Sequence, residues 1–557
     1  KYCNKIYVTD DNPRTESAKR IRDMIISRNK KNFKEIPCRK EAIDFAIKNL
    51  AQNEILLVAG KGHEKFQDYG NYRFKFSDKE EIKKSILKNK KYFKNYNWKI
   101  NILKKTINRN NFNNVTFNNL SIDSKKIKNG DLFLAIRGKN KDGHNYVKEA
   151  LRNGASKVIV SSKLNNVNKN KQIKISNSMN FLNEISNNTR LYSSAKIIGI
   201  TGSAGKTSLK NLVAFVLNKF GSTHSSPKSF NNHYGVPLSI TNLKEKTKFG
   251  VFEIGMSKKG EINKLSNIVK PNVAVITNIS AAHIENFKNL KDIAKEKSEI
   301  INNVSNFGNI ILNKDDKFYK YLFKIAKSKN LNIISFSKKN KADVYLKKII
   351  KKKNIYSLII FVNNKLYKIS SKLVFQNYLE NILSTISVLY ALNLNIGKIN
   401  QIFKKFSFPE GRGDISIIKV EGKKIKFIDE SYNANPLSMK LAINTLNRYK
   451  SYRSKKILIL GDMLELGKNS IKYHQQLSKE INKTNINKVY VCGKYMSKIF
   501  NSIKISKRGE ILKKPECLRR ILKKNVNKND ILMIKGSNAT GLFKISQSLK
   551  KGKINAL

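Results

Sequence analysis

A glycine-rich string near the middle of the chain constrains its fold more than any other feature. The string Gly-Ser-Ala-Gly-Lys-Thr-Ser at residues 202–208 follows an apolar run at residues 197–200 and precedes a helix-like stretch from Leu209. A loop between a buried strand and a helix offers phosphates its backbone amides and a helix N-terminus. Such a loop also places its lysine near the β- and γ-phosphates and its threonine hydroxyl near Mg²⁺. The sequence therefore predicts an ATP and Mg²⁺ site formed by Gly202, Ser203, Ala204, Gly205, Lys206, Thr207 and Ser208.

Short apolar runs alternate with helix-like stretches along most of the chain. Because these runs are apolar on both faces, they indicate buried parallel strands, and we predict an α/β fold. The length of 557 residues leaves room for three or four domains. The predicted strands lie at residues 55–59, 157–160, 197–201, 273–278, 457–460 and 531–534, the seams between domains near 92–98, 193–196 and 408–413, and enlarged surface loops at 161–172 and 337–355.

The formal net charge of +71 would attract polyanions to the surface at low salt. Lysine is nevertheless spread over the whole chain together with abundant asparagine and isoleucine, as AT-rich coding would produce, rather than clustered in a basic arm. A non-enzymatic nucleic-acid-binding protein therefore stands only as an alternative interpretation, and no specific nucleic-acid partner is predicted.

Cysteine usage and hydropathy favour a cytoplasmic protein. The four cysteines, Cys3, Cys38, Cys492 and Cys517, lie far apart without a Cys-x-x-Cys spacing, which argues against a disulfide framework or a zinc site. No apolar run approaches the length of about 18 residues that a membrane span needs. The chain begins at Lys1 with neither a signal segment nor an initiating methionine, which suggests a fragment.

Two further polar residues end strand-like runs downstream of the glycine-rich string. Glu253 ends one apolar run, and His283 follows the run that reaches Thr277. The carboxyl ends of parallel strands are where an α/β sheet presents its chemistry, so both side chains are candidates to hold a metal near the phosphates, together with Thr207. Taken alone, a glutamate is more often a solvated surface group, and a histidine is more often a structural hydrogen-bonding group.

Several longer strings, taken together, resemble the Mur ligase family over about residues 100–557. They are Ser-Ile-Asp-Ser-Lys at 121–125, Gly-Asp-Leu-Phe-Leu-Ala at 130–135, residues 138–144, Asn-Asn-His-Tyr-Gly-Val-Pro at 231–237, Phe-Ile-Asp-Glu-Ser-Tyr-Asn-Ala-Asn-Pro at 427–436, Gly-Asp-Met-Leu-Glu-Leu-Gly at 461–467 and Lys-Gly-Ser at 535–537. The strings at 432–436 and 461–467 resemble the members that add D-alanyl-D-alanine. They distinguish the chain from folylpolyglutamate synthetases, relatives with a similar ATP core, and a ligase of that type with another acceptor is the alternative.

The resemblance implies an ATP-dependent amide ligase of peptidoglycan precursor synthesis. In such an enzyme ATP phosphorylates the terminal carboxylate of UDP-N-acetylmuramoyl-tripeptide, and the amine of D-alanyl-D-alanine attacks the acyl phosphate to give an amide, ADP and phosphate. The resemblance also implies a UDP-sugar-peptide-binding domain at 99–193, a central P-loop ATPase at 194–408 and a Rossmann-like C-terminal domain at 409–557. Whether the third residue of the peptide is diaminopimelate or lysine stays open.

The resemblance further implies roles for individual residues. Catalysis is expected to involve Lys206, Glu253, His283 and Lys297, whose amine such enzymes can carry as a carbamate that adds an anionic metal ligand. Asn381 is expected at the adenine, and Arg412 and Asp429 at the phosphate and ribose. The substrates are expected to contact Ser124, Asn231, Asn232, Tyr432, Asn433 and Asn435. The chain departs from the family pattern at Asn377, where a histidine is common, and at Ser257.

Residues 1–92 carry a separate resemblance, to the C-terminal domain of the family member that adds meso-diaminopimelate. The strings are Asp-Asn-Pro-Arg at 11–14, Ala-Gly-Lys-Gly-His-Glu at 59–64 and Phe-Ser-Asp at 76–78. An arginine fork suits a carboxylate and a glutamate suits an ammonium group, as a zwitterionic amino acid requires. The residues expected to recognise it are Asp11, Asn12, Pro13, Arg14, Gly60 and Glu64. Because the segment has no ATP loop of its own, we expect a partial Rossmann-like domain from a fusion of two pathway enzymes whose upstream part is missing.

Overall fold

The computed structural model describes most of the chain and divides it into two units. The units are Lys1–Asn101 and Ile102–Leu557, and each is described by itself. Helix α4 (Trp98–Ile107) spans the boundary between them in the sequence. The predicted seam near residues 92–98 lies almost entirely outside the described residues, which are 3–27, 33–50, 54–62, 64–88, 98–107, 117–138, 140–353, 355–449 and 454–552.

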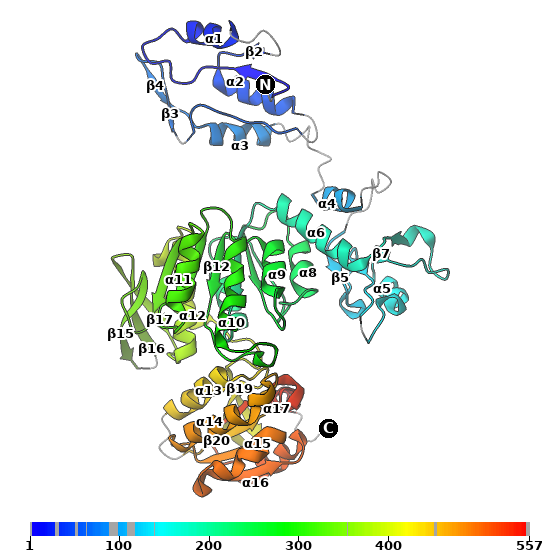
Figure 1. Cartoon of the computed structure of the whole chain (residues 1–557), viewed down its shortest axis with the longest axis vertical. Helices are drawn as coiled ribbons and strands as arrows, with labels where there is room; N and C mark the ends of the chain where they lie inside the picture. Colours follow the sequence, from blue (N-terminus) through cyan, green and yellow to red (C-terminus); the bar gives the residue numbers. More distant parts are fainter. Residues whose placement is uncertain are drawn as a thin grey trace. The chain divides into compact units, whose positions relative to one another are not determined.

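The first unit is built on a short parallel ladder. β1 (Ile6–Val8) pairs in parallel with β2 (Phe33–Glu35), and β3 (Phe66–Asp68) pairs with β4 (Arg73–Lys75) as an antiparallel hairpin. A small apolar cluster of Ile43, Ile47 and Phe76 lies where the second and third helices pack together. The helices of the unit are α1 (Ala18–Ser27), α2 (Arg39–Lys48) and α3 (Asp78–Lys88) (Figure 1).

The strand predicted at residues 55–59 is not present. Residues 54–59 form no strand, and the side chains of Ile55 and Leu57 are 94% and 79% exposed. A buried parallel strand needs hydrogen-bonded neighbours, and within the described part of this unit β1 and β2 pair only with each other. The prediction was wrong because the apolar run lacks the neighbouring strands that its composition anticipates.

The second unit begins with a four-stranded parallel sheet in the order β5-β6-β7-β8. Phe133, Val158 and Val160 form its core together with residues of α5. The strand predicted at residues 157–160 and the loop expected at 161–172, which contains a short 3₁₀ turn, are both confirmed, although Gln172 itself begins β8. The elements are β5 (Leu120–Ser121), β6 (Leu132–Leu134), α5 (Val147–Arg152), β7 (Lys157–Val160), β8 (Gln172–Lys174) and α6 (Ser178–Tyr192).

A nine-stranded sheet follows, in the order β10-β11-β9-β12-β13-β14-β15-β16-β17. The chain enters it at β9, adds β10 and β11 on one side, and then adds β12 to β14 on the other, so that the strand order reverses at β9. In open α/β sheets such a switch point leaves a crevice at the carboxyl ends of the strands, where ligands bind. The parallel strands are β9 (Lys196–Thr201), β10 (Thr223–Ser225), β11 (Phe249–Glu253), β12 (Val273–Ile276), β13 (Asn309–Asn313) and β14 (Asn332–Ser337), which confirms the strands predicted at 197–201 and 273–278.

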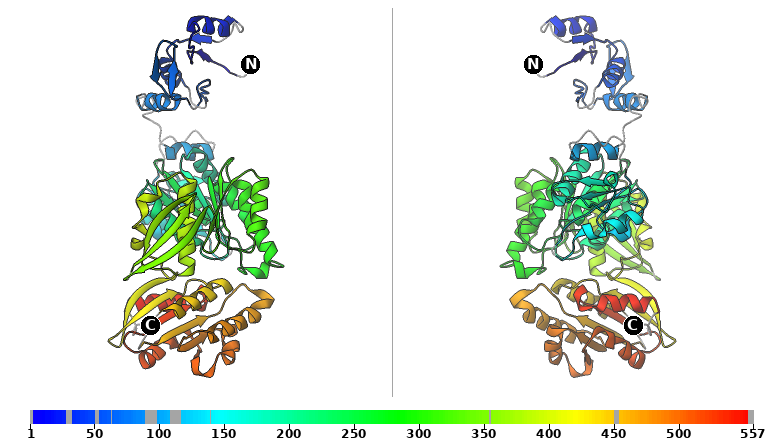
Figure 2. Two further views of the ribbon diagram at one scale, coloured as in Figure 1. Left: turned by 90° about the vertical axis from the view of Figure 1, so that its left-hand side faces the viewer. Right: turned by 90° about the vertical axis from the view of Figure 1, so that its right-hand side faces the viewer.

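Helices cover both faces of this sheet (Figures 1 and 2). On one face α7 (Lys206–Leu217) and α12 (Gln376–Ala391) pack together, and Leu212 and Ile382 share one apolar cluster with Ile198 and Ile200 of β9. α9 (Glu261–Val269) contacts α10 (Leu290–Ser298), which in turn contacts α11 (Tyr319–Ser328). The short helix α8 (Gly235–Thr241) precedes β11.

The last three strands of this sheet form an antiparallel meander of β15 (Val344–Lys352), β16 (Ile355–Val362) and β17 (Lys365–Ser371). The loop predicted at residues 337–355 was therefore wrong, because dense lysine and asparagine concealed a strand that pairs along its length with β16. β16 and β17 are joined by Asn363 and Asn364, which have φ angles of +40° and +66°. Left-handed backbone at both residues is typical of the type I′ turn of a two-residue hairpin.

A third sheet of six strands forms the C-terminal part, in the order β18-β19-β23-β20-β21-β22. β18 pairs antiparallel with β19, and the other described pairs are parallel, as in a Rossmann-like sheet. The strands predicted at 457–460 and 531–534 are confirmed. The strands are β18 (Asp414–Val420), β19 (Lys423–Glu430), β20 (Lys456–Gly461), β21 (Lys488–Cys492), β22 (Arg508–Leu512) and β23 (Ile531–Lys535), and the helices are α13 (Pro436–Arg448), α14 (Ser470–Asn482), α15 (Lys494–Ile499), α16 (Leu518–Asn525) and α17 (Leu542–Lys550).

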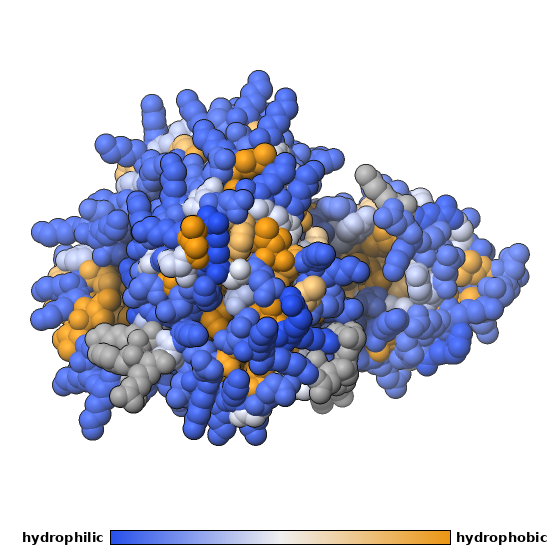
Figure 3. All heavy atoms as spheres, turned by 90° about the horizontal axis from the view of Figure 1, so that it is seen from below, coloured by the Kyte–Doolittle hydropathy of each residue, from blue (hydrophilic) through white to orange (hydrophobic). Residues whose placement is uncertain are grey.

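One face of the molecule is strongly hydrophilic (Figure 3). On the face drawn in Figure 3, hydrophilic residues cover most of the area and hydrophobic ones form small separate patches. Among the described residues, no helix is long and apolar enough to cross a membrane.

Candidate active site

The glycine-rich string joins β9 to α7 through a tight loop, and its last three residues already form the first turn of α7. Gly202 has a φ of +143°, and a Cβ atom placed on it would lie 1.9 Å from Oγ1 of Thr277, so only glycine fits there. Gly205, with a φ of +83°, is the N-cap residue of α7. The N–H group of Ser203 donates to the carbonyl of Asn278 at 2.9 Å, which ties the loop to the segment after β12. The N-terminus of α7 thus borders the crevice at the switch point, as an anion site requires.

The carboxylate of Glu253, at the end of β11, is buried beside this loop. Its Oε2 accepts a hydrogen bond from the Thr207 hydroxyl at 2.6 Å, and its Oε1 accepts one from Nδ2 of Asn231 at 2.7 Å. Both donors are neutral, so the negative charge is not neutralised by either of them. A buried carboxylate of this kind favours a nearby cation, which makes Glu253 and Thr207 a suitable pair for a divalent metal.

The described residues contain no group of three or more histidine, cysteine, aspartate or glutamate side chains that could enclose a metal ion by themselves. This arrangement fits Mg²⁺, which proteins usually hold through one or two carboxylates while phosphate oxygens and water complete the shell. The donors at this site are thus consistent with a metal that binds together with a nucleotide.

Two lysines near the loop have pKa values below their ordinary range. Lys206 donates to the Gly202 carbonyl at 2.7 Å. Burial lowers its pKa, Glu253 opposes that change and Arg412 adds to it. Lys297 on α10 is only 1% exposed, and burial together with the charge of Lys206 holds its pKa well below the usual value. This shift is towards the neutral amine, the form that can react with carbon dioxide to give a carbamate.

His283 lies in a turn that meets the C-terminal part of the chain. Its Nδ1 is 2.5 Å from Oε2 of Glu465, and this contact lowers the pKa of the glutamate. Both residues have left-handed backbone, with φ angles of +57° and +62°. The N–H group of Glu285 also donates to the Glu465 carbonyl at 3.3 Å. Non-glycine residues in this conformation cost energy and often occur at functional sites. The two contacts with Glu465 hold the string at 461–467 directly against the His283 turn.

One cavity of about 560 Å³ brings most of the predicted residues together. Its volume is within the range of small-molecule and cofactor sites. Its wall combines the glycine-rich loop, the ends of the central strands and the loops of the C-terminal sheet. The predicted residues that line it are Ser203, Ala204, Gly205, Lys206, Thr207, Ser208, Asn231, Asn232, Glu253, His283, Asn381, Arg412, Tyr432, Asn433 and Asn435.

Four predicted residues of the second unit do not line this cavity: Gly202, Lys297, Ser124 and Asp429. Gly202 belongs to the glycine-rich loop and Lys297 to α10, as described above. The Ser124 hydroxyl donates to Oε2 of Glu149 at 2.7 Å, within the first sheet of this unit. The Asp429 carboxylate is completely buried, accepts from the N–H group of Ser431 and lies 2.6 Å from Nζ of Lys550. In this structure Asp429 therefore shapes the turn after β19 and does not face the cavity.

The cavity also contains Lys535 and Glu430, to which the sequence analysis assigned no role. Lys535, at the end of β23, places its ammonium 3.2 Å from Oε2 of Glu430, donates to the Asn433 carbonyl at 3.0 Å, and lines the cavity. The Arg412 guanidinium lies over the ring of Tyr432, 4.3 Å from its centroid, a cation–π contact. The strings at 427–436 and 535–537 contained Glu430, Asn433 and Lys535, but only the pairing of β19 with β23 places them together.

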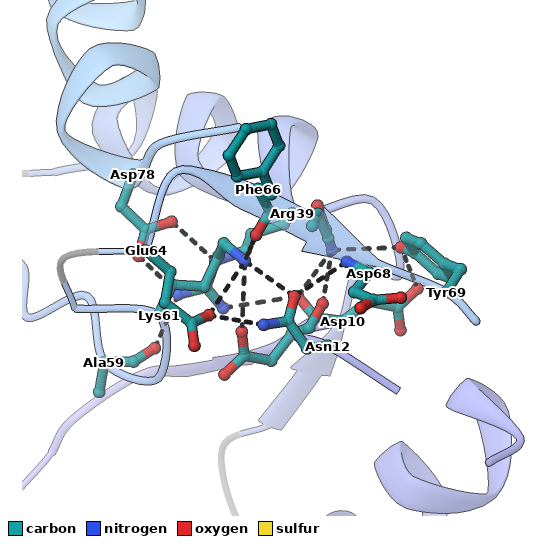
Figure 4. A network of polar contacts seen from close by, with 12 residues as sticks. Asp10, Asn12, Arg39, Ala59, Lys61, Glu64, Phe66, Asp68, Tyr69 and Asp78 are labelled. Carbon is teal, nitrogen blue, oxygen red and sulfur yellow. Dashed lines mark hydrogen bonds and ion pairs between the residues drawn. The ribbon is translucent and has the colours of Figure 1, made fainter. Parts of the chain in front are cut away.

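In the first unit, the two strings predicted to recognise an amino acid meet around Lys61, a residue with no assigned role. Its ammonium donates to Oδ1 of Asn12 at 2.9 Å and to the Phe66 carbonyl, and it lies 3.6 Å from Oε2 of Glu64 (Figure 4). Nδ2 of Asn12 donates to the same glutamate at 2.5 Å. Asn12 and Glu64 are thus held side by side.

The other residues predicted for this site lie around the same cluster. Oδ1 of Asp11 is 3.8 Å from the Lys61 ammonium, and a Cβ atom on Gly60 would lie 2.6 Å from Oδ2 of Asp11. Pro13 is buried, whereas Arg14 is exposed and has a left-handed backbone. His63 lies outside the described residues.

Several stretches of the chain match domain models of one protein family. Residues 116–190 match the model described as Mur ligase family, catalytic domain, and residues 200–389 match the Mur ligase middle domain. Residues 1–62 and residues 415–538 both match the Mur ligase, glutamate ligase domain. These matches follow the three sheets of the second unit and include residues 1–62 of the first unit.

Similar proteins of known name span most of the chain. The UDP-N-acetylmuramoyl-tripeptide--D-alanyl-D-alanine ligases of Rickettsia prowazekii and of Buchnera aphidicola from Acyrthosiphon pisum are each 34% identical to it, over 78% of this chain and 95% and 93% of their own lengths. Among solved structures, the MurF ligase of Thermotoga maritima in complex with ADP is 27% identical, with a TM-score of 0.66 over 79% of this chain and 98% of its own. The MurF structure from Acinetobacter baumannii, 24% identical, has a TM-score of 0.70 over 81% of this chain and 98% of its own and supports the fold.

Proposed function

The chain belongs to the Mur ligase family, and from this premise we infer that it is an ATP-dependent, ADP-forming amide ligase that joins D-alanyl-D-alanine to UDP-N-acetylmuramoyl-tripeptide in peptidoglycan precursor synthesis. The observation that carries the inference is the shared cavity. Lys206 at the start of α7 and Glu253 at the end of β11 line it together with Tyr432, Asn433 and Asn435, which connect β19 to α13. A carboxylate phosphorylated beside Lys206 and Glu253 can therefore meet an amine that is bound beside Tyr432, Asn433 and Asn435.

Amide formation proceeds in two steps in this scheme. The γ-phosphoryl group passes to an oxygen of the tripeptide carboxylate, and ADP leaves. The amine nitrogen of the dipeptide then attacks the carbonyl carbon, a C–N bond forms, the C–O bond to phosphate breaks, and the nitrogen loses a proton to solvent. The first step needs little beyond placement and charge compensation, which the N-terminus of α7 and the ammonium of Lys206 supply from one side and Arg412 from another.

We propose that Thr207, Glu253 and His283 hold Mg²⁺, which would offset phosphate charge when bound. The buried carboxylate of Glu253, whose two hydrogen-bond donors are neutral, supports this role. We also propose that Lys297 carries a carbamate. Its low pKa supports this modification, in which the neutral amine attacks carbon dioxide, an N–C bond forms and a proton is lost. Asn381 is proposed to contact adenine and Arg412 the phosphates, whereas a ribose contact from Asp429 requires its carboxylate to leave Lys550.

The assignment of parts to substrates is likewise a proposal. Residues 99–193, with Ser124, are proposed to bind the UDP-sugar peptide, residues 194–408 to bind ATP and residues 409–557 to bind the dipeptide through Tyr432, Asn433 and Asn435, with Asn231 and Asn232 facing them. We propose that the reaction takes place in the cytoplasm, where ATP and UDP-linked precursors are available.

The first unit supports a second proposal. We propose that Asp11, Asn12, Pro13, Arg14, Gly60 and Glu64 belong to a site for a zwitterionic amino acid such as meso-diaminopimelate, in a domain fused from an upstream ligase. The carboxylate of Glu64, held beside Asn12 by Lys61, supports ammonium recognition. Titration calorimetry of the chain with meso-diaminopimelate and with lysine tests this proposal, and equal or absent heats for both would reject it.

The main proposal is tested by phosphate release from the purified chain with ATP, Mg²⁺, UDP-N-acetylmuramoyl-tripeptide and D-alanyl-D-alanine, with one component omitted at a time. Release should need all four and should be lost in Lys206→Ala. Release that ignores the dipeptide, or that instead responds to a folate and glutamate, would reject this acceptor and favour a folylpolyglutamate-type ligase.

A further inference from the structure

A second lysine of α7 is buried more deeply than Lys206. Lys210 follows Lys206 by one helical turn, is 1% exposed and does not line the cavity. Its ammonium donates to the carbonyl of Ser226 at 2.5 Å and to that of Lys228 at 2.7 Å. Burial lowers its pKa to about 8. A buried ammonium is unfavourable unless its hydrogen bonds are satisfied. Lys210 and the segment that carries these two carbonyls therefore hold each other in place.

The segment that Lys210 binds, residues 226–232, leads from β10 to α8 along the wall of the cavity. At its start the Ser226 N–H donates to the Val251 carbonyl at 3.1 Å, and the Ser226 hydroxyl accepts from the N–H group of Glu253 at 3.1 Å. Lys228 has a φ of +44°, a conformation that a lysine adopts only at a cost. The ammonium of Lys210 binds the carbonyls on both sides of Pro227 and so holds this strained turn.

Two side chains of the same segment contact residues with proposed roles in the reaction. The Ser229 hydroxyl accepts from Nη2 of Arg412 at 2.9 Å. Asn231 donates to Oε1 of Glu253, and its carbonyl accepts from the N–H group of Gly255 at 2.8 Å. The segment therefore contacts the Glu253 carboxylate through Asn231 and the Arg412 guanidinium through Ser229. Its own position is fixed by the hydrogen bonds from Lys210.

We propose that Lys210 is a positioning residue for the ligase reaction: its ammonium fixes residues 226–231 so that Ser229 and Asn231 hold Arg412 and Glu253 in place. The proposal rests on the proposed ATP-dependent function but concerns a residue that touches neither nucleotide nor acceptor. A lysine suits the role because one compact ammonium with three donors can serve two converging carbonyls. Methionine fills a similar volume but leaves both carbonyls without a donor.

The chain offers a matched control. Lys456, at the start of β20, is 2% exposed, and its ammonium donates to the Asn447 carbonyl and to Oδ1 of Asn485, both at 2.8 Å. It does not line the cavity. Lys456→Met therefore removes an equally buried ammonium with the same number of bonds at a place with no expected influence on the reaction.

The test compares Lys210→Met, Ser229→Ala, the double variant and Lys456→Met with the wild type, by steady-state kinetics and by binding of a fluorescent ATP analogue without acceptor. Because small displacements of catalytic groups cost about tenfold to hundredfold in rate, Lys210→Met should lower kcat/KM for ATP by at least about tenfold. Lys456→Met should stay within about twofold. If Lys210 acts through Ser229, adding Ser229→Ala to Lys210→Met should cause little further loss, whereas independent roles would give multiplied losses.

Multiplied losses, or equal effects of the two buried-lysine variants, would overturn the proposal. Lys210→Gln, which keeps one donor, replaces Lys210→Met if that variant does not fold, and its loss should again be masked by Ser229→Ala. Nucleotide binding separates the two proposals: a wild-type chain that binds the analogue but releases no phosphate rejects the assigned acceptor, while the binding cycle still tests Lys210.

Discussion

Replacement of Glu253 by glutamine should separate the catalytic from the structural role of this carboxylate. The change keeps the shape of the side chain and an oxygen that can accept from the Thr207 hydroxyl, while the Asn231 amide can reverse to meet the new NH₂ group. What disappears is one negative charge beside the proposed metal. At a separation of about 4 Å and an effective dielectric constant of about 20, two unit charges interact by about 4 kcal/mol. A loss of that size corresponds to about a thousandfold in kcat/KM.

Stability should respond in the opposite sense. In the absence of nucleotide, Glu253→Gln removes a buried charge whose two hydrogen-bond donors are neutral, so the Tm should stay the same or rise by about 2 °C. Phosphate release and differential scanning fluorimetry measure the two effects. Glu480→Gln is the control, because it removes a carboxylate paired with Lys440 at 2.7 Å away from the cavity. Activity within about threefold of wild type, or a Tm lower by more than about 5 °C, would refute the assignment and make Glu253 a structural residue.

Three further predictions concern the loop, a buried lysine and the first unit. Gly202→Ala should reduce ATP affinity by at least about a hundredfold in titration calorimetry, because its Cβ would lie 1.9 Å from Oγ1 of Thr277 and the loop must shift; unchanged affinity would show that the loop adapts. Lys210 has a folded pKa of about 8 against 10.5 in its unperturbed state, so the unfolded chain binds more protons between these values and stability should rise with pH there. The Tm difference between wild type and Lys210→Met should therefore move in favour of wild type from pH 8 to pH 10, and a constant difference would contradict the low pKa. Lys61→Met should lower any affinity for meso-diaminopimelate by at least about tenfold, since Asn12 and Glu64 lose their shared partner; no change would place the amino-acid site elsewhere.

Local signals sufficed for the centre of the fold and for the phosphate loop. The string at 202–208 joins a buried strand to a helix, as predicted, although the helix begins at Lys206 rather than at Leu209. The prediction was possible because both the glycine positions and the flanking apolar periodicity are encoded within about twenty residues of sequence. Glu253 could be proposed because it ends an apolar run, and Asn381 because the family resemblance implied it. Apolar runs failed where their neighbours decide the outcome, as at residues 55–59, and charged composition concealed β15.

The contacts that organise the site could not be predicted from local sequence patterns, because they join residues that lie far apart in the chain. Arg412 and Ser229 are separated by 183 positions in the sequence, and Lys61 and Asn12 by 49. Nothing local in Ser-Leu-Lys at 208–210 distinguishes Lys210 from the many solvated lysines of the chain, and only the packing of α7 shows that it is buried. Asp429 shows what a matching string leaves out: its carboxylate accepts a hydrogen bond from the N–H group of Ser431 and lies beside Lys550, and neither contact can be read from the string.

The hairpin turn of Asn363 and Asn364 is a suitable place to insert a label into the enzyme. No residue of β15, β16 or β17 lines the cavity, and two-residue loop tips with small polar side chains tolerate insertions well. A short peptide tag placed between these two asparagines could therefore attach the enzyme to a surface, and a fluorophore there could label the nine-stranded sheet. The ligase reaction would continue at the ends of β9, β11 and β12.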